Sequence, residues 1–342
     1  MNDIELAKKL SKLKKESQQR AKRDTCLLCG KQVTGFCKSH LIPQFVLNNI
    51  ASNGTVVWSA DFIDTFNKHQ HFNWGVAKAE TFYVICNQCD NTMFQDYENE
   101  IALSVAPTNR MMAEIAIKNL CRMLSNRFVE NEEYPIMERE FANFRGKDAM
   151  LDLQNLDIKD FSFSLKRAKS IVERNLKSGF HLMYWLSLPF VAPIASQTMV
   201  IVYKDMDGVI INNIYTSNDN DRMQELHLCI FPLKSSTVVF LFYHKDDTKY
   251  RAFEKRFNRL SNDDKLKYTI YLLLHHSEEF VVSPLKTKEL AELKGFKKLV
   301  SEGMDGPDLG FKEGIDLLLG TEEPLLDWRI TPNILSEEYK LL

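Results

Sequence analysis

Two Cys-x-x-Cys pairs, Cys26-Leu-Leu-Cys29 and Cys86-Asn-Gln-Cys89, constrain this chain more than any other feature of its sequence. Two intervening residues allow a tight turn to aim both sulfurs of a pair at one ion, and Gly30 gives the first turn a permissive backbone. We therefore expect the four thiolates to hold one structural zinc ion in tetrahedral geometry. A redox-active pair, or four buried thiols, is the alternative interpretation.

Length and composition favour a globular protein of two domains. At 342 residues the chain exceeds one ordinary core, and 44% hydrophobic with 26% charged residues is typical of soluble proteins. Seven cysteines do not suit a secreted disulfide framework, and we find no apolar signal segment, so a cytoplasmic location is expected. Pro189 and Pro193 interrupt the uncharged run 180–203, which we interpret as a helix end, a turn and a buried strand. No membrane contact is expected.

The first 24 residues carry an excess of lysine and arginine over acidic residues. Apolar residues recur there at helical spacing, so residues 3–22 are predicted to form a short basic amphipathic helix. Such a helix can contact phosphates, although a solvated helical surface is the commoner meaning of a basic run.

Residues 25–104 are predicted to form a zinc-binding domain. A strand that ends before Pro43 presents His40, an inserted loop spans 51–80, and a second strand delivers the second cysteine pair to a helix. Strand, cysteine pair and helix in this order describe a treble-clef finger, that is, a ββα-metal arrangement. The expected strands are 33–38, 55–59 and 82–85, and the expected helices are 44–50 and one that starts at residue 90.

Residues 105–342 are predicted to form a larger α+β domain with an antiparallel sheet and packed helices. Hairpin signals join four runs of strand-like sequence, at 199–203, 209–215, 225–231 and 237–243. Helices are expected at 111–128, from residue 164, at 248–260 and at 262–276. The acidic stretch 129–160 contains Pro135 and Gly146, and we interpret it as an irregular linker.

The first cysteine pair with Gly30, the His40-Leu-Ile-Pro43 element and the second pair with its polar helix resemble HNH (His-Me finger) endonucleases built around a structural zinc. The resemblance covers residues 25–100. It implies that His40 is the general base that activates water, and that Mg²⁺ or Mn²⁺ stabilises the transition state. Imidazole titrates near neutral pH and can take a proton from water beside a phosphate.

The chain departs from the HNH pattern at two positions. Ser39 stands where the family often has an aspartate ligand, and Asp90 stands where it often has a histidine ligand. Asp90 offers a carboxylate for a hard cation. The central asparagine of the family has no clear equivalent. Thr81 lies near its place, and Asn91, further along the chain, is the remaining candidate for the catalytic site.

A second resemblance is to uncharacterised bacterial proteins with a Ser-His-Ile-Ile-Pro-x-Phe element, followed later by a Cys-x-x-Cys-acidic-Asn helix that contains a glutamate. It suggests phage defence or mobile-element biology. The matching residues are Ser39, His40, Ile42, Pro43 and Phe45 in the first part, and Cys86, Cys89, Asp90, Asn91 and Glu98 in the second.

Several other side chains have both a functional and an ordinary interpretation. Cys37 could replace a zinc ligand but more often packs as a small hydrophobe, and Glu98 and Glu100 could serve a metal or face solvent. The loop histidines His69 and His71 could approach the catalytic site or be solvated. His275 and His276 end a helix and are expected to cap it as cations. The basic sets at 166–177 and 249–259 could contact phosphates or be ordinary helix surfaces.

Two functions follow from these observations. The first is a zinc-stabilised, divalent-metal-dependent nuclease acting on nucleic acid, DNA rather than RNA, whose region 105–342 selects a target, senses a signal or binds a protein partner. The second is a non-catalytic treble-clef module that binds nucleic acid or protein.

Overall fold

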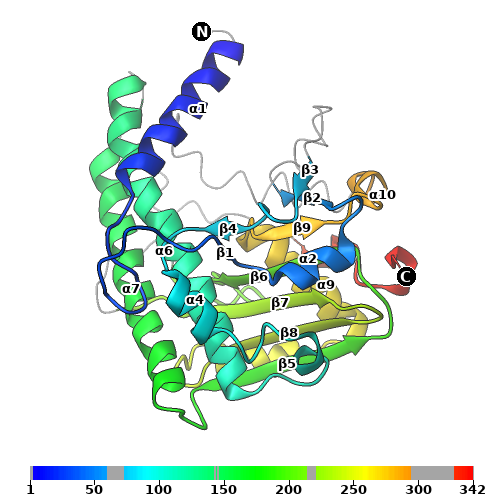
Figure 1. The fold of residues 1–342 in the computed structure, drawn as a ribbon. Helices are drawn as coiled ribbons and strands as arrows, with labels where there is room; N and C mark the ends of the chain where they lie inside the picture. Colours follow the sequence, from blue (N-terminus) through cyan, green and yellow to red (C-terminus); the bar gives the residue numbers. More distant parts are fainter. Residues whose placement is uncertain are drawn as a thin grey trace.

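An antiparallel sheet forms the centre of the molecule, with helices against both faces (Figure 1). The computed structural model describes residues 3–59, 73–141, 144, 146–213, 221–293 and 327–341. Within these residues the sheet has seven strands in the order β3-β2-β9-β6-β7-β8-β5. The strands are β2 (Thr55–Trp58), β3 (Asn73–Gly75), β5 (Phe180–Leu188), β6 (Ile194–Val200), β7 (Leu226–Pro232), β8 (Thr237–His244) and β9 (Phe280–Val282).

Alternation along the strands divides the apolar side chains between two cores. In β8, Phe240 and Phe242 face one core, whereas Val239 and Leu241 face the other. The first core contains buried residues of α2 (Gln44–Ile50), α6 (Asn109–Glu140), α7 (Lys147–Glu173) and both cysteine pairs. The second contains residues of α8 (Tyr250–Phe257), α9 (Asn262–His276) and the carboxy-terminal segment. The cysteines and α8 therefore lie on opposite faces of the sheet.

A small two-stranded ladder and a helix lie at the cysteine pairs. In it β1 (Ser39–His40) runs antiparallel to β4 (Thr81–Phe82), with His40 opposite Thr81, and α4 (Asn87–Met93) follows β4 after a few residues. This is the expected order of two strands and a helix. The remaining elements are α5 (Glu100–Leu103), α10 (Thr287–Ala291) and two 3₁₀ turns, η1 (Trp328–Ile330) and η2 (Glu337–Tyr339).

The predicted linker at 129–160 is wrong, because α6 and α7 fill almost all of it and pack along each other. Pro135 lies inside α6, and Gly146 (φ 86°) only marks the start of α7. Arg127 compensates two of the acidic residues: it pairs with Glu130 at 2.5 Å within α6 and with Asp157 of α7 at 2.8 Å.

Some strand predictions are also corrected. Residues 180–188 form strand β5 and not a helix end, residues 33–38 are irregular, and β4 stops at Phe82. A backbone hydrogen bond still joins segments 33–38 and 83–86, since the Cys37 N–H donates to the Ile85 carbonyl at 2.8 Å. The described part of 209–215 follows a turn at Gly208 (φ 81°) and contributes one bridge, Ile210 to Lys204, in place of a strand.

Other local predictions are confirmed. Helices α2, α8 and α9 and strand β2 occur at the predicted places, and the Ser261 hydroxyl accepts the Asp264 N–H at the start of α9. The basic helix is α1 (Asp3–Arg20), which packs on α6 through an ion pair of Glu16 with Arg139 at 3.1 Å. Among the described residues, no helix has both the length and the apolar character needed to cross a bilayer.

The boundary expected at residue 104 does not divide the sheet. Strands β2 and β3 come from the predicted zinc domain, and β2 pairs with β9 through Val57 opposite Val282. The region that carries the four cysteines and the larger region therefore share one sheet and one core, and their division into functional parts stays a prediction.

Candidate metal centre and the histidine beside it

The four cysteine sulfurs gather as the sequence predicts. Their Sγ atoms all lie within 4.8 Å of one another, and Cys29 Sγ is 4.0 Å from Cys86 Sγ. A tetrahedral zinc ion with Zn–S bonds of about 2.3 Å needs sulfurs about 3.8 Å apart. The quartet Cys26, Cys29, Cys86 and Cys89 is thus positioned to hold a metal ion, as a structural zinc requires.

Local backbone structure builds each half of the quartet. Gly30, in left-handed conformation (φ 67°), donates its N–H to the Cys26 carbonyl at 2.9 Å and closes the first turn. Cys86 caps α4 and Cys89 lies in its first turn, so the helix itself sets their spacing. Leu27 N–H donates to the Val84 carbonyl at 3.0 Å and joins the halves.

Of the four thiols, Cys26 is the one whose surroundings favour the thiolate that binds a cation. Burial raises the pKa of Cys26, but N–H groups of the turn and of Cys86 outweigh it and bring the pKa to about 7. Burial and the neighbouring sulfurs raise the pKa of Cys89. Four thiolates so close together repel one another, and a divalent cation removes that repulsion when it binds.

His40 lies at the end of β1 and is half-buried. Its Nε2 is 3.3 Å from the Val76 carbonyl oxygen. A carbonyl only accepts, so Nε2 carries the hydrogen and Nδ1 keeps its lone pair. Burial, with the charges of Lys118 and Lys38, lowers the pKa of His40, which keeps the ring neutral at pH 7. The ring is therefore in the form of a base.

Asp90 contacts the strand that carries His40. Ser39 Oγ donates to Asp90 Oδ1 at 2.5 Å, and Cys37 Sγ donates to Oδ2 at 3.3 Å. Cys37 thus belongs to this contact and lies outside the quartet; burial and Asp90 raise its pKa to about 11. Asn91 is exposed on α4, and in the described hydrogen bonds it contributes its backbone carbonyl, to Gln95 at 2.7 Å.

Lys118 is the residue of this site that sequence reasoning missed. Its side chain, 1% exposed, projects from α6; Nζ pairs with Glu98 and lies 3.9 Å from Asp90 Oδ1. Nζ also lies 4.3 Å from the centre of the Phe94 ring, a cation–π contact. A lysine on a helix ordinarily faces solvent, so no local pattern marks it. Glu98 is its ion-pair partner, and Glu100 accepts the Lys234 N–H at 2.8 Å.

Replacing Lys118 with Met should destabilise the chain by about 2–3 kcal/mol. Removing one partner of a buried pair leaves its carboxylates uncompensated, at about 3–5 kcal/mol for full burial, and the partial exposure of Glu98 reduces this figure. Urea unfolding measures the effect. Lys166→Met, at an exposed position of α7, is the control and should change stability by less than about 0.5 kcal/mol. Equal stability of the two variants would show that the charge of Lys118 does not stabilise the fold.

Of the basic sets, the one on α7 adjoins the metal centre. Lys169 Nζ donates to the carbonyl of Leu28, between the first two cysteines. Lys166 and Arg174 line the same cavity of about 330 Å³ beside Leu27. The set on α8 lies against the other core, where Arg256 pairs with Asp205 at 2.5 Å. Lys166, Lys169 and Arg174 therefore lie beside the metal centre, and we call them the α7 set; Arg167 pairs instead with Asp247 at 3.0 Å.

The remaining histidine candidates do not reach this site. Burial lowers the pKa of His275, and burial with the charge of His275 lowers the pKa of His276 to about 3. Both histidines lie in the last turn of α9 as expected, but these shifts favour the neutral ring over the cation that a helix cap would use. His69 and His71 lie outside the described residues.

Comparison with known proteins adds no family to this description. No family model, no curated protein and no solved structure matches the chain.

Proposed function

We propose that the chain is a zinc-stabilised nuclease that cleaves phosphodiester bonds, with His40 as its general base. The observation that carries the proposal is the state of the His40 ring. The Val76 carbonyl fixes the hydrogen on Nε2, and the lowered pKa leaves Nδ1 able to take a proton from water at neutral pH. The order of β1, β4 and α4 supports it, because it is the order that the resemblance to HNH endonucleases implies.

Asp90 is the carboxylate that would hold Mg²⁺ or Mn²⁺ in this proposal. It accepts two hydrogen bonds, and a carboxylate has about four lone-pair sites, so capacity for a cation remains. Lys118 competes for the same oxygen, and among the described residues only the cysteine quartet brings three typical ligand groups together. We therefore propose a weakly held cation that supplies charge stabilisation to the phosphate and has water in most of its coordination positions.

Nucleic acid is the proposed substrate, DNA rather than RNA, and the α7 set is its proposed phosphate contact. The double variant Lys166→Ala/Arg174→Ala should weaken binding roughly tenfold at 0.1 M salt. The slope of log K against log salt should become less negative by about 1.8, because each lost phosphate contact reduces its magnitude by about 0.9. Fluorescence anisotropy over a salt series measures both quantities.

The matched control is Lys255→Ala/Arg259→Ala, which removes two exposed charges from α8 and the turn after it, on the opposite face of the sheet. It should leave the slope unchanged. If the two double variants weaken binding equally, net charge and not the α7 surface governs the interaction.

A non-catalytic binding module is the second candidate, and the Asp90 contacts favour it. Both Asp90 oxygens accept hydrogen bonds from neighbouring side chains, and the Lys118 ammonium lies on the side where a cation is needed. In this candidate the network is structural, and the chain binds nucleic acid or protein without cutting it. A protein partner for region 105–342, and a role in phage defence or mobile-element biology, remain proposals that rest on the resemblance alone.

A further inference from the structure

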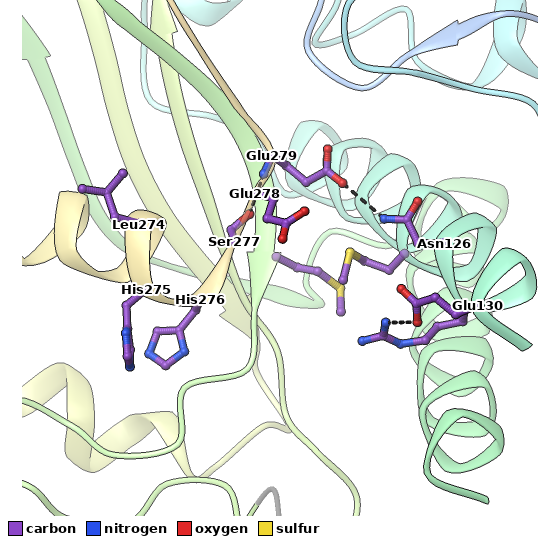
Figure 2. Close-up of a pocket in the computed structure, with 11 residues that line it drawn as sticks. Asn126, Glu130, Leu274, His275, His276, Ser277, Glu278 and Glu279 are labelled. Carbon is purple, nitrogen blue, oxygen red and sulfur yellow. Dashed lines mark hydrogen bonds and ion pairs between the residues drawn. The ribbon is translucent and has the colours of Figure 1, made fainter. Parts of the chain in front are cut away.

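A second group of buried charges lies between β4, α6 and the start of β9. Glu80 is 3% exposed and Glu279 is 6% exposed. Arg122 Nε donates to Glu279 Oε1 at 2.8 Å, but its nearest contact with Glu80 is 3.9 Å. Asn126 also donates to Glu279 Oε1, and Figure 2 shows these two side chains meeting from α6 and from the segment before β9. Two buried carboxyl groups thus share one cation.

Three oxygens of this pair lack a donor. By geometry neither oxygen of Glu80 accepts a hydrogen bond within the described residues, and Glu279 Oε2 does not either. Burial and the charge of Glu279 raise the pKa of Glu80 well above its ordinary value, although the nearby Trp58 indole N–H favours its ionised form. Glu80 therefore favours its protonated form, whereas Arg122 lowers the pKa of Glu279 and favours its carboxylate. Buried acceptors left without donors are rare in proteins and indicate a missing ligand or water.

Glu80 and Glu279 also line a cavity of about 500 Å³ that has aromatic side chains in its wall. Trp58 and Trp74 both line it, with ring centres 5.7 Å apart and planes at 82°. Two indole rings beside two carboxyl groups form an environment that attracts cations. The other charged side chains that line it are Lys14 and Lys78, and the acidic Glu130, Glu133 and Glu278.

We propose that this cavity binds an alkylguanidinium or alkylammonium group, with Glu80 and Glu279 as its anionic partners and the two tryptophans as its wall. Such a cation brings the N–H donors that the carboxyl oxygens lack, and its flat or compact head can lie against an indole face. A metal ion is a poorer fit, because among the described residues only the cysteine quartet places three typical ligand groups within reach of one another.

Charge balance predicts how the binding of this cation depends on pH. Empty, the site holds a protonated Glu80, a Glu279 carboxylate and the Arg122 guanidinium, and these charges sum to zero. A bound monocation takes the place of the Glu80 proton and leaves that sum unchanged, so binding releases one proton. Below the pKa of Glu80 the affinity should therefore rise about tenfold per pH unit. The inference does not depend on nuclease activity, since none of these groups is His40 or Asp90.

Isothermal titration calorimetry on the full zinc-loaded chain tests the inference. Butylguanidinium should bind, and its neutral counterpart butylurea should bind at least tenfold more weakly, because only the cation replaces the proton. Repeating the titration in buffers of different ionisation enthalpy counts the released proton. Comparing N-acetylarginine amide with free butylguanidinium distinguishes an arginine side chain of another protein from a small free guanidine as the natural source of the guanidinium group.

Two variants and a control locate the site. Glu80→Gln keeps the shape of the protonated acid but cannot release a proton, so it should lose most of the binding and all of the pH dependence. Trp74→Ala, on a ring that is 37% exposed, should weaken binding several-fold without unfolding the chain. Tyr83→Ala, an exposed aromatic residue outside the cavity lining, should bind as the wild type does.

Three outcomes would overturn the inference: no binding of either cation, equal binding of butylurea, or a tighter response to Mg²⁺ or Mn²⁺ that Glu80→Gln abolishes. Unaltered binding by Glu80→Gln, with its folding verified by circular dichroism, would equally place the ligand elsewhere.

Discussion

Replacing Cys86 with Ser should remove the zinc ion and unfold the region around it. An ion held by the quartet would join the turn at Cys26 to the start of α4, and no disulfide joins these segments among the described residues. Structural zinc contributes apparent free energies of about 10–16 kcal/mol in small zinc domains, so loss of one thiolate should cost several kcal/mol. Because the quartet borders the core that contains Phe94 and Tyr97, the melting temperature of the whole chain should fall.

Zinc content, measured by atomic emission on the purified protein, and thermal melting test this prediction together. Cys37→Ser is the matched control: Cys37 donates to Asp90 outside the quartet, and serine keeps a donor there. The control should retain its zinc. If Cys86→Ser also retains a full complement of zinc, the four cysteines are not the metal site.

Replacing His40 with Ala should lower the rate of phosphodiester cleavage by about 10²–10⁴-fold, the usual contribution of a general base. Zinc content and melting temperature should change little, because the ring is half-buried and its one described hydrogen bond is the 3.3 Å contact with Val76. His181→Ala is the control, since this histidine is 47% exposed and pairs with Glu254 on the far core.

The pH dependence adds a second test of His40. The base acts in its neutral form, and burial lowers its pKa below the ordinary value of 6.5. The rate should therefore rise as pH increases towards 6.5 and stay level between pH 7 and 8, as far as His40 determines it. A rate that still climbs steeply above pH 7 would mean that another group, or the metal-bound water, supplies the base.

The parts of the site that depend on local spacing were predictable. Two residues between the cysteines of a pair already imply a shared metal, and the quartet lies where that spacing predicts. The same holds for α9, where Ser261 caps a run of apolar residues at helical spacing. Each of these signals is complete within a few residues, so it does not need the rest of the fold.

Features that join distant segments were not predictable. Lys118 is buried because Asp90 and Glu98 neutralise it across the interface of α6 with α4, and Glu80 meets Glu279 because β4 and the segment before β9 both pack on α6. The acidic stretch 129–160 seemed irregular because its compensating charge, Arg127, becomes a partner only when α7 folds back. Pairing of β2 with β9 likewise spans most of the chain.

The most direct test of the central claim is a cleavage assay with the zinc-loaded wild type on double-stranded and single-stranded DNA and on RNA, at rising Mg²⁺ or Mn²⁺. The nuclease proposal predicts cutting of DNA that increases into the millimolar range of metal, because Asp90 holds the cation weakly, and that His40→Ala abolishes. If the folded, zinc-loaded chain binds these nucleic acids but cuts none of them at any metal concentration, the proposal is contradicted and the binding-module candidate takes its place.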